Sequence, residues 1–295
     1  MSLYRDEAIV LRTQKLGEAD RIITLLTKDH GRIRGVAKGV RRTMSKFGAR
    51  LEPGSHVDLQ LHVGKTFDTI TQVEALMNYG EALTQDYQRW TVASAILEAA
   101  ERFSPNEHEP ALQEFQLVVG GMRALAENRY EPLLILDAFL LRSLAVAGYA
   151  PSMTICSRCE KPGPHRYFSL VGGGSVCNDC RPSACATPAM ETLQLMGALI
   201  SSDWESATAS EGKHRREASG LIAAYLQWHL ERCLRSLPMV ERVLQFIFLI
   251  TLPLLWMATD AGQSSAVCRA RQDMKQGRPH FLMWLKVQLN LVLKS

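Results

Sequence analysis

The first 77 residues contain five strand-like stretches, and apolar and polar positions alternate with a period of two in three of them, 32–37, 57–63 and 67–73. All five stretches are short and are bounded by turn residues, which is typical of β-strands. They cover residues 4–13, 21–27, 32–37, 57–63 and 67–73. Five short strands with one longer connection suit a small barrel of the OB type. We therefore predict an OB-fold β-barrel over residues 1–79.

From residue 81 onward the apolar positions recur with the period of an α-helix. The predicted helices are 83–103, 110–127, 132–147, one beginning near 188, and 215–234. Prolines stand at the expected starts of the second and third helices, and Gly148 follows the third. The pattern predicts an α+β chain in which the barrel is followed by an α-helical domain over residues 80–243.

The remaining residues, 244–295, form an atypical tail that is apolar and basic. Residues 243–259 carry no charge, and as a helix they would rise only about 25 Å, short of the roughly 30 Å hydrocarbon core of a bilayer. Pro253 also interrupts the run. We expect no membrane span here, although a membrane-tethered scaffold stays open as an alternative.

Four cysteines are the strongest chemical signal in the chain. Cys156 and Cys159 form one C-x2-C pair, and Cys177 and Cys180 form a second pair after seventeen residues. Two such pairs brought together by a hairpin supply four thiolates in the tetrahedral arrangement that Zn²⁺ prefers. We predict one structural zinc ion per chain, held in a module at residues 151–186.

Two other interpretations of these cysteines remain. A redox dithiol usually opens a helix in a βαβ unit, and no such pattern surrounds either pair. Disulfides require an oxidising compartment, whereas Met1 to Val10 is too charged and polar to be a secretory leader. Because four thiolates leave no position for water, the predicted zinc would hold the fold and take no part in catalysis.

A basic segment from residue 30 to residue 51 is the second signal, because it contains no carboxylate. Its cations are Arg32, Arg34, Lys38, Arg41, Arg42, Lys46 and Arg50. Unpaired positive charge of this kind binds phosphate backbones, and Phe47 is positioned to stack on a base. We predict a nucleic-acid-binding surface formed by these eight residues; the alternative is a solvated charged face.

Charge and motifs limit the other possibilities. Residues 1–80 hold 13 Lys and Arg against 9 Asp and Glu, whereas residues 81–243 hold 15 against 19, so the two parts should meet different partners. Val63 to Thr66 imitates the end of a phosphate-binding loop, but Leu59 stands where that motif needs glycine. We predict a hairpin turn there and, since no catalytic set emerges, a protein that is not an enzyme.

Several segments of the chain resemble the DNA repair and recombination protein RecO family. They are residues 17–26, 30–42, 47–53 and 177–182, together with Tyr225-Leu226 leading into Leu237-Pro238. The resemblance covers about residues 1–243, and the tail from Leu244 does not share it.

This resemblance implies a bacterial recombination mediator with an OB fold, a helical C-terminal domain and, in many members, a zinc module. It further implies that the chain binds single- and double-stranded DNA, anneals complementary strands without ATP and, with RecR, helps to load RecA onto DNA coated by SSB. The acidic C-terminal tail of SSB would bind the helical domain. The implied location is cytoplasmic and nucleoid-associated. A zinc-stabilised OB-fold module that binds RNA or acts in translation is the alternative function.

Overall fold

The structure, a computed structural model, describes residues 2–104, 106–230 and 234–240. The predicted tail at 244–295 therefore lies outside the described residues. Two compact units divide the described chain. The first contains residues 2–150, 196–209 and 234–240, and the second contains residues 151–195 and 210–230. The domain boundaries expected at 79/80 and 243/244 stay predictions.

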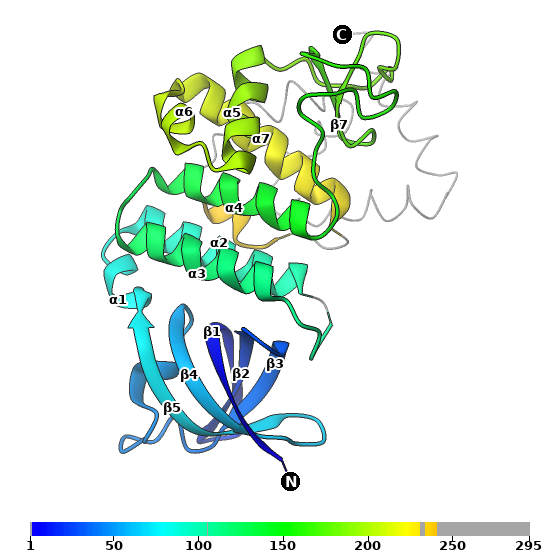
Figure 1. Ribbon diagram of the computed structural model, residues 1–295. Helices are drawn as coiled ribbons and strands as arrows, with labels where there is room; N and C mark the ends of the chain where they lie inside the picture. Colours follow the sequence, from blue (N-terminus) through cyan, green and yellow to red (C-terminus); the bar gives the residue numbers. More distant parts are fainter. Residues whose placement is uncertain (1, 105, 231–233, 241–295) are drawn as a thin grey trace, which may run out of the picture. The chain divides into compact units, whose positions relative to one another are not determined.

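Five strands form a closed barrel in the first unit (Figure 1). They are β1 (Leu3–Leu16), β2 (Asp20–Thr27), β3 (Gly31–Ala37), β4 (Ser55–His62) and β5 (Asp68–Asn78). Their order is β1-β2-β3-β5-β4, and β1 closes the barrel by also pairing with β4. All pairs are antiparallel except β3 with β5. The predicted OB-type barrel and the α+β class are confirmed.

Strand β1 can pair with two neighbours because it is long and bent. Its first half pairs with β4 and its second half with β2, and the register with β2 shifts between Val10 and Arg12. Such a bulge increases the local bend and twist that a closed barrel needs. A Cβ atom at Gly35 would lie 2.9 Å from Ile70 Cγ1, so glycine allows β3 to approach β5 closely.

Four helices follow the barrel in sequence. They are α1 (Tyr79–Leu83), α2 (Tyr87–Phe103), α3 (Leu112–Ala126) and α4 (Pro132–Val146). Helices α2, α3 and α4 pack against one another, and α2 and α3 also contact β1 (Figure 1). The prediction of one continuous helix over 83–103 was wrong. Asp86 ends the continuity because its side chain accepts the backbone N–H of Arg89 at 3.1 Å and so caps a new helix.

The later elements are α5 (Met190–Ser201), α6 (Trp204–Ala209), α7 (Gly212–His229) and the short strands β6 (Tyr167–Ser169) and β7 (Gly174–Val176). The short helix α6 was not predicted. Helix α7 ends before the predicted residue 234, because Leu230 already has extended backbone angles. None of the helices in the described ranges is both long and apolar enough to cross a bilayer.

The helical packing buries one carboxyl group. Glu114, in the first turn of α3, is 3% exposed, and the Ser143 hydroxyl of α4 donates a hydrogen bond to its Oε1 at 3.0 Å. Its Oε2 is buried and has no hydrogen-bond partner among the described residues. Burial raises the pKa of Glu114 to about 7, against the opposing effect of the Ser143 hydrogen bond. The folded chain therefore favours the neutral acid.

The unfolding free energy should depend on this carboxyl group. The unfolded chain releases the Glu114 proton near its ordinary pKa, whereas the folded chain holds it to about 7, so stability falls as the pH rises through this interval. We expect Glu114→Gln to remove about 2 kcal/mol of the stability difference between roughly pH 5 and pH 8. Urea titrations at the two pH values measure this. Glu127→Gln, at the exposed end of α3, is the control, and an unchanged pH dependence in Glu114→Gln would contradict the assignment.

Candidate nucleic-acid interface and metal centre

The connection between β3 and β4, residues 38–54, is called the basic loop below. Three of its apolar side chains, Val40, Phe47 and Leu51, are buried in the core cluster of the barrel. The last part of the loop forms a short 3-10 helix, Gly48–Leu51. Because these apolar side chains point into the barrel, the polar side chains between them are directed to solvent.

The role predicted for Phe47 is corrected by this arrangement. Its ring is 1% exposed and belongs to the barrel core, so it presents no face on which a base can stack. The ammonium of Lys46 lies 4.9 Å from the ring centroid and covers it from outside. The sequence signal was ambiguous because an aromatic residue among cations is expected both in a stacking platform and in an anchored loop.

The cations of the basic loop are exposed, and those with hydrogen bonds use backbone carbonyl oxygens. Arg41 Nη1 donates to Glu18 O at 2.8 Å, Lys46 Nζ to Thr71 O at 2.8 Å, and Arg50 Nη1 to Lys46 O at 3.0 Å. Lys38 and Arg42 are exposed as well. A carbonyl oxygen orients a cation without neutralising it, so the loop keeps its positive charge.

The basic loop is also attached to the turn between β1 and β2. The backbone N–H of Gly39 donates to Asp20 Oδ1 at 2.7 Å, and the backbone N–H of Arg41 donates to Ala19 O at 3.0 Å. Gly39 has φ +68°, a conformation that favours glycine. These bonds fix the start of the loop beside a turn that OB folds use for ligands.

Arg32 and Arg34 lie on β3 rather than on the basic loop, and they are paired. Glu107, in the connection between α2 and α3, has its Oε1 2.5 Å from Arg34 Nε and 3.9 Å from Arg32 Nη2. The expectation that the basic segment has no counter-charge is therefore wrong for these two arginines. The carboxylate comes from a distant part of the sequence, so the segment itself gave no sign of it.

The loop between β4 and β5, residues 63–67, contributes two further side chains to the candidate nucleic-acid interface, Lys65 and Phe67, which the sequence pattern did not indicate. Lys65 is exposed, and the Arg34 guanidinium carbon lies 4.9 Å from the centroid of the Phe67 ring. The corresponding loop of OB folds commonly contacts oligonucleotides. The antiparallel pairing of β4 and β5 also confirms the predicted hairpin in place of a nucleotide-binding loop.

A polar groove of about 410 Å³ lies on the outer face of β1, β4 and β5. Arg5 is part of its lining, but Asp58 lies 2.7 Å and Glu74 3.6 Å from the Arg5 guanidinium. Lys46 is the other cation of the lining. Both carboxylates pair with Arg5, so Lys46 is the cation of this lining that keeps its charge. This groove therefore offers a phosphate less than the basic loop does.

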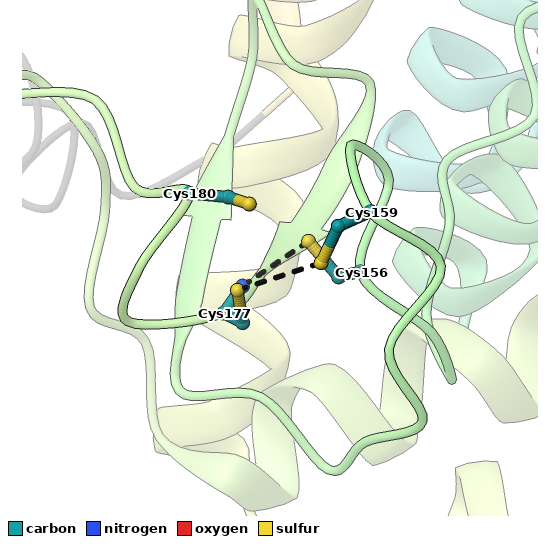
Figure 2. Close-up of side chains that lie close together, drawn as sticks. All are labelled: Cys156, Cys159, Cys177 and Cys180. Carbon is teal, nitrogen blue, oxygen red and sulfur yellow. Dashed lines mark hydrogen bonds between the residues drawn. The ribbon is translucent and has the colours of Figure 1, made fainter.

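The four predicted metal ligands come together in the second unit. The sulfur atoms of Cys156, Cys159, Cys177 and Cys180 lie within 4.8 Å of one another and face a common centre (Figure 2). Cys159 Sγ and Cys177 Sγ are 3.7 Å apart. A tetrahedron with Zn–S bonds of about 2.3 Å has edges of roughly 3.8 Å. The cluster can therefore hold a metal ion, and its donor set fits zinc.

Two short turns position these sulfur atoms. In the first, the backbone N–H of Glu160 donates to Cys156 O at 2.9 Å, and Glu160 has φ +60°. In the second, the backbone N–H of Cys177 donates to Cys156 Sγ at 3.4 Å, which is the main cause that lowers the pKa of Cys156 to about 6. Strands β6 and β7, paired from Tyr167–Val176 to Ser169–Gly174, join the turns.

Neighbouring thiols have the opposite effect on the last ligand. The hydrogen bond with Cys177 is the largest of the effects that raise the pKa of Cys180 to about 12. Four adjacent sulfur atoms resist simultaneous ionisation, and a divalent cation removes that resistance. His165 stands outside the cluster, because its Nε2 is hydrogen-bonded to Lys161 O at 2.8 Å.

Comparison with known proteins agrees with this architecture. The family profile for the recombination protein O N terminal matches residues 1–79, and that for the recombination protein O C terminal matches residues 84–238. Proteins named DNA repair protein RecO from Streptomyces avermitilis and Streptomyces griseus are 58% and 57% identical over 248 residues. The protein of the same name from Thermobifida fusca is 58% identical over 242 residues. Each match covers 82% of this chain and the whole of the relative.

The fold, the basic loop and the four-cysteine cluster together define the class of this protein. It combines an OB-type barrel that carries a basic loop with helices and a four-cysteine module. The particular family follows from the matches. The chain belongs to the recombination protein O (RecO) family.

Removing one ligand should release the metal. We expect protein purified without chelator to contain about one zinc ion per chain and Cys177→Ser to contain far less, because three thiolates bind zinc more weakly than four. Residues 151–186 should then be cleaved faster in limited proteolysis. Cys185→Ser is the matched control, because this cysteine lies in the same segment but outside the cluster. Full metal content in Cys177→Ser would contradict the assignment.

Proposed function

We propose that this chain is a DNA repair protein that acts as a recombination mediator. It binds single- and double-stranded DNA, anneals complementary strands without ATP and, together with RecR, helps to load RecA onto DNA coated by SSB. Membership of the RecO family and the names of the relatives support the repair role. The observation that carries the DNA-binding part is the row of exposed cations on the anchored basic loop.

The physical basis of annealing is charge neutralisation. Lys38, Arg41, Arg42, Lys46 and Arg50 contact strand phosphates, and two strands held on such surfaces repel each other less. Complementary bases then meet more often. Phosphate contacts carry no sequence information, so the activity is independent of sequence. No catalytic step is assigned to the chain.

The zinc ion supplies no chemistry in this function. Cys156, Cys159, Cys177 and Cys180 hold it, and it fixes the segment around them as a structural site. The protein partners, RecR and the acidic C-terminal tail of SSB, follow from the family and belong to the same proposal, as does a location on the nucleoid in the cytoplasm.

The dependence of binding on salt tests the DNA interface. If about five phosphates are neutralised on a single strand, the logarithm of the affinity should fall with the logarithm of the salt concentration with a slope near −3.5. Changing both Arg41 and Arg42 to Ala should make the slope shallower by about 1.4. Fluorescence anisotropy with a labelled oligonucleotide measures both values.

The matched control changes Arg123 and Arg129 to Ala, which removes the same charge from exposed positions on and just after α3. A slope near zero in the parent protein would refute the interface. Competition between DNA and RNA strands of equal length and sequence separates the proposal from an RNA-binding module, which should prefer RNA.

Annealing tests the mediator role itself. We expect the protein to speed the pairing of two complementary oligonucleotides in the absence of nucleotide, and the Arg41→Ala/Arg42→Ala variant to lose most of that acceleration. Loss of fluorescence from a donor–quencher pair of strands follows the reaction. If both proteins bind strands but neither accelerates pairing, the chain is a DNA binder without annealing activity.

A further inference from the structure

The outer face of β3 carries two arginines, Arg32 and Arg34, that form ion pairs with the carboxylate of Glu107. Along β3 the burial of side chains alternates, so Arg32 and Arg34 lie on the outer face while Ile33 lies in the core. Arg34 also covers the ring of Phe67. The outer face of strands 2 and 3 and the loop between strands 4 and 5 are the usual ligand surface of an OB fold.

Glu107 reaches this surface because its own backbone is attached to β3. The backbone N–H of His108 donates to Arg32 O at 3.0 Å, and Glu107 and Arg32 form an isolated parallel β-bridge. A side chain at Gly31, which has φ +66°, would overlap the carbonyl of Glu109. The position of the carboxylate therefore depends on backbone contacts and not on its charge alone.

The carboxylate is close to Arg34 but does not satisfy it. Arg34 Nε is buried and makes no hydrogen bond within the described residues, although Glu107 Oε1 lies 2.5 Å away, so that oxygen is out of line with the N–H. The Arg34 side chain is still 40% exposed, and that of Glu107 is 25% exposed. Partly exposed ion pairs of this kind are weak, and a phosphate offers oxygens that can bind a guanidinium in a bidentate manner.

We propose that Glu107 competes with nucleic-acid phosphate for Arg32 and Arg34, and thereby lowers the affinity of the barrel for DNA. This inference rests on the DNA-binding function proposed above. The phosphate takes the place of the Glu107 carboxylate between the two arginines. The Phe67 ring lies next to the Arg34 guanidinium at this site. The carboxylate of the basic loop itself, Glu52, pairs with Arg21 of β2 and not with the loop's cations. The basic loop therefore binds first, and the β3 site adds to the affinity only when Glu107 is displaced.

The isosteric variant Glu107→Gln tests the competition. It removes the anion but keeps the size of the side chain and the backbone bond of His108 to Arg32. We expect the affinity for a single-stranded oligonucleotide to rise about five- to tenfold. The salt slope should become steeper by about 0.7 to 1.4, because one or two further phosphates are neutralised by Arg32 and Arg34. If Glu107 only attaches the connection to the barrel, the affinity and the slope stay unchanged while the stability falls.

Glu101→Gln is the matched control. Glu101, on α2, also pairs with an arginine of the barrel, Arg12 of β1, at 3.6 Å, and its neutralisation changes the net charge equally. A second variant adds Arg34→Ala to Glu107→Gln, and we expect this change to remove most of the gain. A gain equal to that of Glu101→Gln, or one that survives the loss of Arg34, would overturn the inference.

The same titrations separate the two proposals. If the parent protein binds with a steep salt slope and Glu107→Gln behaves like it, only the competition is refuted. If neither protein binds DNA, the DNA-binding function fails and the competition with it. If Glu107→Gln binds and the parent does not, competition by Glu107 is supported in its strongest form. Chemical unfolding of each variant, measured alongside, shows that the compared proteins are folded.

Discussion

The burial of Val40, Phe47 and Leu51 in the barrel is the interaction on which the candidate interface depends. Repulsion between the many cations of this loop disfavours a single compact conformation. Three buried apolar side chains, each contributing about 1.5–3 kcal/mol of transfer free energy, are enough to hold it in place. The loop then presents charges at fixed positions, because its apolar side chains occupy the interior.

The four-cysteine module depends on a different constraint. Its own buried cluster contains only Cys156, Val176 and Cys177 among the described residues, with Tyr167 and Cys180 packed against it. Two of these three buried residues are cysteines of the four-thiol cluster, and the other large buried side chain of the module, Phe168, packs against Tyr225 of α7. A zinc ion can contribute on the order of 10 kcal/mol to the folding of such a site. We therefore expect a metal ion bound by these four thiolates to order the module, whereas the barrel is ordered by its core.

Local sequence patterns correctly predicted the features that neighbouring residues determine, namely the strands and the cysteine pairs. The five strand-like stretches became β1 to β5, and the spacing of Cys156, Cys159, Cys177 and Cys180 identified a cluster that the structure brings together. The errors have a common cause in tertiary contacts. Phe47 is a core residue because the loop folds back onto the barrel, and Arg34 is paired because Glu107 comes from another connection. Neither contact leaves a signal in the neighbouring residues.

The same contacts change how the charge asymmetry of the chain is understood. The sequence suggested that a basic barrel and an acidic helical region meet different partners. In the first unit, however, Glu101 pairs with Arg12, and Glu107 pairs with Arg32 and Arg34, so part of the opposite charge is used inside the molecule. These pairs join the helical region to the barrel. The exposed cations of the basic loop, in contrast, hydrogen-bond to backbone carbonyl oxygens, so they keep positive charge for an external anion.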